Sequence, residues 1–179
     1  MMDCFFRTPQ PIEVDITIER NAIIETVVST LNKMAEARFD GQNTQYVNNM
    51  QPEVDFEQDR NLVYGYYKEG VANIVRRIEP YVKSCETTPT EETETETEQV
   101  DGNVFHLVFP EKWKSSQQPV LETKIQNYLV HYIIAQWLEK VSVSDTTYTM
   151  EKAAQLLRDI KGVCELRKGK VHRIWNGTY

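Results

Sequence analysis

Apolar residues recur every three or four positions through much of the first half of the chain, which is the spacing of a helix with one buried face. The first such helix is predicted to begin after Asp15 or Thr17, because either side chain can cap a helix, and to end at Gly41. The second is predicted to begin at Asp55, and Pro80 ends or kinks it. Two amphipathic helices are therefore expected before the middle of the chain.

The pattern changes in the second half. Residues 103–109 are rich in β-branched and aromatic side chains and are predicted to form a strand. A third helix is predicted from Pro119, and its apolar residues occupy most of the circumference, which indicates a central, largely buried helix. A fourth helix is predicted over about 147–167. In residues 170–175 basic and apolar side chains alternate, as they do in a strand.

These elements predict a mainly α fold: a four-helix bundle-like domain with a small two-stranded β element formed by residues 103–109 and 170–175. The chain divides into a helical part, residues 1–83, an acidic insertion, residues 84–101, and a strand–helix–helix–strand part, residues 102–179. We expect the first and third parts to pack together as one domain.

The acidic insertion reads SCETTPTEETETETEQVD and contains seven acidic residues and no basic residue. Its charge of −7 equals the net charge of the whole chain, because residues 1–83 carry −4 and residues 102–179 carry +4. It lacks the apolar groups needed to offset an ordering entropy of about 1–2 kcal/mol per residue, so it is predicted to be disordered. The opposite charges of the two flanking parts favour head-to-tail self-association or a charged partner.

No motif for catalysis, phosphate binding or metal binding occurs in the sequence. Histidines and cysteines are scattered, without the spacing of metal ligands or of a catalytic pair: His106, His131, His172, Cys4, Cys85 and Cys164. We therefore expect no catalytic residue, no cofactor and no metal, with reduced thiols as in cytoplasmic proteins. No apolar run reaches the roughly 18 residues needed to span a bilayer, so no membrane partner is expected. A small enzyme whose site has no recognisable motif is a further hypothesis.

Basic and aromatic residues gather at the C-terminal end. Arginine and large aromatic side chains are enriched in protein interfaces, and an alternating segment can add a strand to the sheet edge of a neighbour. By contrast, Trp113 and Trp137 fit a hydrophobic core. The candidate partner-binding residues are Arg167, Lys168, Lys170, His172, Arg173, Trp175 and Tyr179.

Three runs of the second half, FHLVFPEKW, LETKIQNYLVHYIIAQWLEKV and MEKAAQLLRDIKGVCELRKGKVHR, resemble proteins of prophage structural-gene clusters in Bacteroidales. In those proteins a strand ends in a proline and a tryptophan, and a YLVxYxxxxWL helix, a leucine-rich LxDI helix and a basic tail follow. The helical content and terminal β segment are also similar to head–tail connector, or neck, proteins of tailed phages. The resemblance covers about residues 103–173.

The resemblance implies a non-enzymatic virion protein that is assembled in the cytoplasm of a bacterial host. Its expected partners are further copies of itself in a homo-oligomeric ring, and the portal and tail proteins of a phage. DNA would only pass through the channel of the ring, and the basic C-terminal tail would be the docking element. The alternative hypothesis is a cytoplasmic helical adaptor or regulator that binds a basic partner through the acidic insertion.

Overall fold

The computed structural model of the chain describes residues 10–38, 51–52, 57–88, 101–141 and 146–167. Four helices and three strands make up this part of the chain, together with short 3₁₀ turns at Glu79–Tyr81 and Ser115–Gln117. In chain order the elements are β1 (Ile12–Glu19), α1 (Arg20–Arg38), α3 (Glu57–Arg77), β2 (Val82–Thr88), β3 (Gly102–Phe109), α4 (Gln118–Lys140) and α5 (Thr147–Glu165).

The strands form an antiparallel sheet in the order β1-β3-β2, so β3 is central and the other two are edge strands. Strand β1 pairs with β3 along its whole length, from Ile12 opposite Phe109 to Glu19 opposite Gly102. The helix predicted to begin after Asp15 or Thr17 therefore does not begin there. The physical reason is strict alternation: every second side chain of β1 is buried against the helices, as a half-buried strand requires.

The sheet also differs from the predicted two-stranded element. The strand predicted at 103–109 is confirmed as β3, whereas its predicted partner, 170–175, lies outside the described residues. Instead β3 pairs with β1 on one side and β2 on the other. Strand β2 includes Ser84–Thr88, which begin the acidic segment of the sequence, so the part of that segment with no described structure is 89–100.

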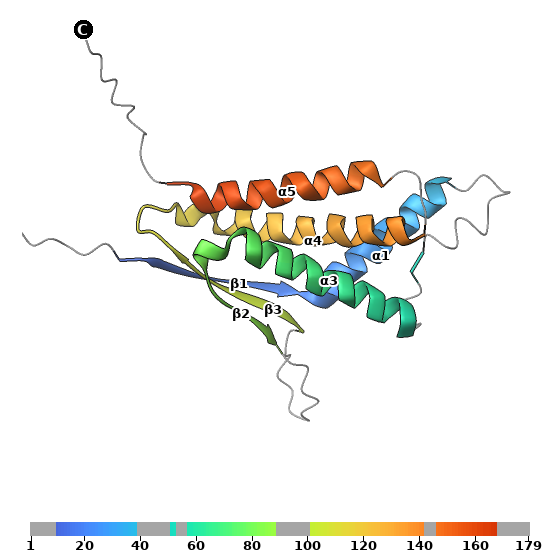
Figure 1. Cartoon of the computed structure of the whole chain (residues 1–179), viewed down its shortest axis with the longest axis horizontal. Helices are drawn as coiled ribbons and strands as arrows, with labels where there is room; N and C mark the ends of the chain where they lie inside the picture. The colour runs from blue at the N-terminus through green and yellow to red at the C-terminus, as the bar shows by residue number, and fades with distance from the viewer. Residues whose placement is uncertain (1–9, 39–50, 53–56, 89–100, 142–145, 168–179) are drawn as a thin grey trace, which may run out of the picture.

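Helix α4 lies at the centre of the helical layer (Figure 1). It packs lengthwise against α5, contacts α3 and α1, and also touches strand β1. Nine of its side chains are buried, which confirms the prediction of a central helix. The four helices are arranged on one face of the sheet. A bundle in which the helices pack mainly on one another, as the sequence predicts, therefore stays a prediction. No helix in the described residues is both long and apolar enough to cross a lipid bilayer.

The contact between α3 and α4 depends on a glycine. A Cβ atom at Gly70 would lie 2.9 Å from Leu129 Cδ2 and 3.2 Å from Tyr132 Cδ1, which is closer than side-chain atoms normally approach. Glycine at this position lets the two helices pack closely. At Gly65, five residues earlier in the same helix, a Cβ atom would meet nothing within 4 Å.

One hydrophobic core joins the sheet to all four helices. Both tryptophans that fit a core in the sequence are buried, Trp113 completely and Trp137 at 3% exposure. The Trp113 ring stacks on Phe109 with centroids 4.0 Å apart, and its Nε1 donates a hydrogen bond to the Val163 carbonyl oxygen at 3.0 Å. Trp113 therefore connects the end of β3 to the last turn of α5.

Cys164 lies in this core with no exposed surface, and burial raises the pKa of its thiol from an ordinary 9.0 to about 12. Between these pH values the unfolded chain loses the thiol proton while the folded chain keeps it, so the free energy of unfolding must fall as pH rises. We expect this group alone to contribute a slope approaching about 1.4 kcal/mol per pH unit.

Urea unfolding of the parent and of Cys164→Ser at several pH values between 8 and 11 measures this contribution. Serine does not titrate in this range, and the buried tyrosines are common to both proteins, so the difference in slope belongs to Cys164. Identical slopes for the two proteins would contradict the prediction.

Candidate functional site

The face of the sheet that points away from the helices carries acidic side chains. In β1 the residues between the buried ones, Glu13, Asp15, Thr17 and Glu19, are all exposed. Glu86 extends from β2 on the same side and is 70% exposed. No element in the described part of the chain covers this surface. We call it the acidic face and define it by Glu13, Asp15, Glu86 and the residues that contact them.

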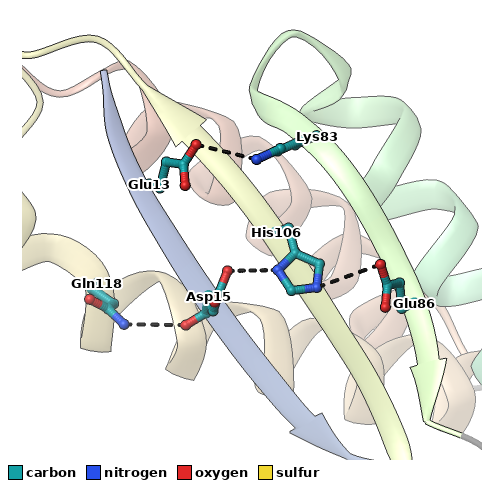
Figure 2. Close-up of polar contacts among 6 residues, drawn as sticks. All are labelled: Glu13, Asp15, Lys83, Glu86, His106 and Gln118. Atoms are coloured by element: carbon teal, nitrogen blue, oxygen red, sulfur yellow. Dashed lines mark hydrogen bonds and ion pairs between the residues drawn. The ribbon is translucent and has the colours of Figure 1, made fainter. Parts of the chain in front are cut away.

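A row of three side chains crosses the acidic face, one from each strand (Figure 2). At its centre is His106 of β3, whose Nδ1 lies 2.7 Å from Asp15 Oδ1. Its Nε2 lies 3.9 Å from Glu86 Oε1. The row exists because antiparallel pairing places Asp15 opposite His106 and brings Glu86 close to it from the other edge.

A second contact runs parallel to this row. Lys83 Nζ of β2 lies 3.3 Å from Glu13 Oε1 of β1, reaching across β3 (Figure 2). Between the two contacts is a hollow of about 280 Å³, lined by these charged side chains and by Ser84. Gln118, the first residue of α4, donates a hydrogen bond at 3.3 Å to the carbonyl oxygen of Asp15 and so fixes β1 to the helical layer.

Three carboxylates and one ammonium group make the acidic face electronegative. The ion pair between Lys83 and Glu13 is solvent-exposed and contributes little to stability, about 0–1 kcal/mol. An incoming lysine or arginine can therefore exchange with Lys83 at small cost. Within the described residues no group of three or more His, Cys, Asp or Glu side chains is placed to hold a metal ion. What the surface can do chemically is attract and orient a cationic segment.

Other titratable groups with shifted pKa values lie away from the acidic face. Burial raises the pKa of the Cys85 thiol, and a hydrogen bond from Asn103 opposes part of that rise. Burial, assisted by Lys152, lowers the pKa of His131. Both the half-buried Cys85 and the fully buried Cys164 hold the thiol proton more tightly than a free thiol, which makes each a weaker nucleophile.

The structure describes only Arg167 among the predicted partner-binding residues. It follows α5, forms a β-bridge with Trp113, and its Nη1 donates to the Cys164 carbonyl oxygen at 2.8 Å. Its Nη2 lies 3.4 Å from the Tyr81 hydroxyl. Arg167 thus connects the end of α5 to Trp113 and Tyr81 of its own chain. The others lie outside the described residues: Lys168, Lys170, His172, Arg173, Trp175 and Tyr179.

Sequence reasoning missed the acidic face. The alternation of apolar and acidic residues from Ile12 to Glu19 was a signal that could have revealed an exposed acidic strand. The local sequence contained no such signal for His106 and Glu86. These residues lie near Asp15 because the strand order pairs segments that are far apart in the sequence.

Comparison of the chain with protein-family models, with curated proteins and with solved structures gives no match.

Proposed function

We propose that the chain is a non-enzymatic subunit of a phage head–tail connector, which assembles with identical copies into a ring between portal and tail. The observation that carries this proposal is the acidic face, an uncovered surface opposite in charge to the basic tail, residues 168–179. Two different, complementary surfaces on one chain produce a head-to-tail interface, and such interfaces close into rings when the rotation between subunits permits.

In this proposal the tail, residues 168–179, extends from one subunit to the acidic face of the next subunit or to the portal. Lys168, Lys170 and Arg173 supply the cations, and Trp175 and Tyr179 supply apolar contact area. DNA passes through the channel of the ring without being read. The protein is assembled in the bacterial cytoplasm and resides in the virion.

Reversing charge on the acidic face should weaken self-association. We expect the double variant Glu13→Lys and Glu86→Lys to raise the dissociation constant about tenfold, because each reversal replaces an attraction with a repulsion. The matched control, Glu36→Lys and Glu151→Lys, changes the net charge equally at exposed positions of α1 and α5. Sedimentation velocity at several salt concentrations measures the effect.

A compensating charge reversal in the tail tests whether the tail contacts the acidic face. The double variant Lys168→Glu and Lys170→Glu should weaken self-association of the otherwise unchanged protein in the same way. Combining these two changes with the reversed acidic face should restore self-association. The proposed interface would be overturned if the acidic-face variant and the control variant lost self-association equally, or if the combined variant did not regain it.

Deleting residues 91–98 separates the connector from the adaptor hypothesis. The deletion keeps all of β2 and keeps Asp101, which forms an ion pair with Arg20. Assembly should survive it if the chain is a connector. Loss of partner binding with an intact fold would favour an adaptor that uses the acidic segment.

A further inference from the structure

A groove of about 590 Å³ runs between helix α3 and strand β2. One wall is apolar and comes from Val71, Ala72 and Val75 of α3, while Cys85 and Thr87 of β2 form part of the other. Glu86 lies between these two strand residues and points to the acidic face, so the groove is on the other side of the sheet. It is open because α3 packs mainly against α4. We call it the α3–β2 groove.

Two buried donors border this groove without an acceptor. Among the described residues, neither the Tyr67 hydroxyl nor Arg20 Nε has a hydrogen-bond partner, although Tyr67 is only 2% exposed. The guanidinium of Arg20 is held in place by an ion pair with Asp101 and by the ring of Tyr64, 4.3 Å away. Burial raises the pKa of Tyr67, so its hydroxyl keeps the proton and remains a donor. Buried donors without partners are rare in native proteins, and an acceptor supplied from outside would satisfy them.

The groove has the dimensions of an added strand. Strand β2 is an edge of the sheet, and its outer side pairs with no strand of the described chain. The α3 residues that border the groove run from Tyr67 to Arg76, which is about 14 Å along a helix. A strand segment of about four residues has this length, and it would lie about 4.8 Å from β2.

The rim of the groove selects for negative charge. Lys68 and Arg76 are exposed on α3, and Glu79 is the one carboxylate among the residues that border the groove. The basic tail of the chain would be repelled here, whereas an acidic segment would be attracted.

We propose that the α3–β2 groove binds an acidic, extended segment of a partner protein, which adds to the free edge of β2 as a fourth strand. Backbone hydrogen bonds to β2 provide affinity, and an apolar side chain that points into the groove packs against Val71 and Val75. Carboxylates two positions before and after it point to the same side and approach Lys68 and Arg76. An acceptor of the segment receives hydrogen bonds from Tyr67 and Arg20. This site is separate from the acidic face, so the inference does not rest on ring assembly.

A soluble acetylated peptide with the sequence Glu-Thr-Val-Thr-Glu, in which both glutamates and the valine point to one side of an extended strand, serves as the probe, and a peptide with lysine in place of each glutamate is its control. Calorimetric titration of the full chain should show saturable binding of the acidic peptide alone. The double variant Lys68→Glu and Arg76→Glu should weaken this binding about tenfold. The matched variant Lys33→Glu and Arg158→Glu, with the same change of charge on α1 and α5, should leave it unchanged.

Two further measurements test strand addition itself. The peptide should slow amide hydrogen exchange of the β2 residues Cys85–Thr87, since their outer backbone groups become paired. Tyr67→Phe should weaken peptide binding about two- to tenfold through the lost donor, without lowering the midpoint of thermal unfolding.

Equal weakening in the two charge variants, binding of the lysine peptide, or unchanged exchange in β2 would each overturn the inference. Failure of self-association would not, because the acidic face and the α3–β2 groove lie on opposite sides of the sheet.

Discussion

Replacing Trp113 with alanine is expected to lower the free energy of unfolding by about 3–5 kcal/mol, the range for removing a fully buried large aromatic side chain. The substitution has three effects. The ring no longer stacks on Phe109, the hydrogen bond from Nε1 to the Val163 carbonyl disappears, and a cavity opens where β3 meets α5. Because Arg167 forms its bridge with this same residue, the end of α5 should loosen as well.

Trp113→Phe separates the contribution of the aromatic ring from that of the hydrogen bond. It keeps an aromatic ring against Phe109 but leaves the buried Val163 carbonyl without its donor, so we expect a loss of about 1–3 kcal/mol. Urea unfolding followed by far-ultraviolet circular dichroism measures both variants. A loss below about 1 kcal/mol for Trp113→Ala would show that Trp113 does not connect β3 to α5 as described.

Gly102→Ala is expected to cost about 3 kcal/mol or more, the upper end of the range for overpacking. Gly102 begins β3 opposite Glu19, and a Cβ atom there would overlap the carbonyl group of Ile18. The obstacle is the backbone of the paired strand, which cannot rotate away as a side chain can. Relief would require β1 and β3 to separate where Arg20 pairs with Asp101.

Gly65→Ala is the matched control, with the same added methyl group in an open position. Nothing lies within 4 Å of its Cβ, and alanine is a better helix former than glycine, so we expect a gain of about 0.5–1 kcal/mol. The midpoints of thermal and urea unfolding should thus rise for Gly65→Ala and fall for Gly102→Ala. A Gly102→Ala protein as stable as the parent would contradict the close approach of β1 to Gly102.

Helices with a strong apolar pattern were predictable from the sequence. Helix α4 begins one residue before Pro119, and α5 begins at Thr147 as predicted, because burial on these helices follows their spacing of three and four. The burial of Trp113 and Trp137 is also confirmed. In these helices the residues that the local pattern marks as an apolar face are also the residues that tertiary packing buries.

Strands β1 and β2 were not predictable in the same way. In β1 the possible capping residues Asp15 and Thr17 competed with the alternating pattern, and the apolar stripe that follows them favoured a helix. Strand β2 is a polar edge strand that merges into the Thr/Glu-rich sequence, so it lacks an apolar face of its own. Its formation depends on pairing with β3, a contact between segments that local sequence does not specify.

The candidate sites were harder to predict for the same reason. The acidic face combines residues from all three strands, and the α3–β2 groove combines a helix with a sheet edge. The basic tail, by contrast, was visible in the sequence, because its basic residues lie close together along the chain. Complementarity between that tail and the acidic face became evident only when the strand order was known.

The most direct test of the connector proposal is the native mass of the full chain, measured alone and with the portal protein of the same genome. We predict a closed ring of identical copies that dissociates as salt is raised and that joins the portal. A protein that stays monomeric at every concentration and binds neither portal nor tail proteins would contradict it.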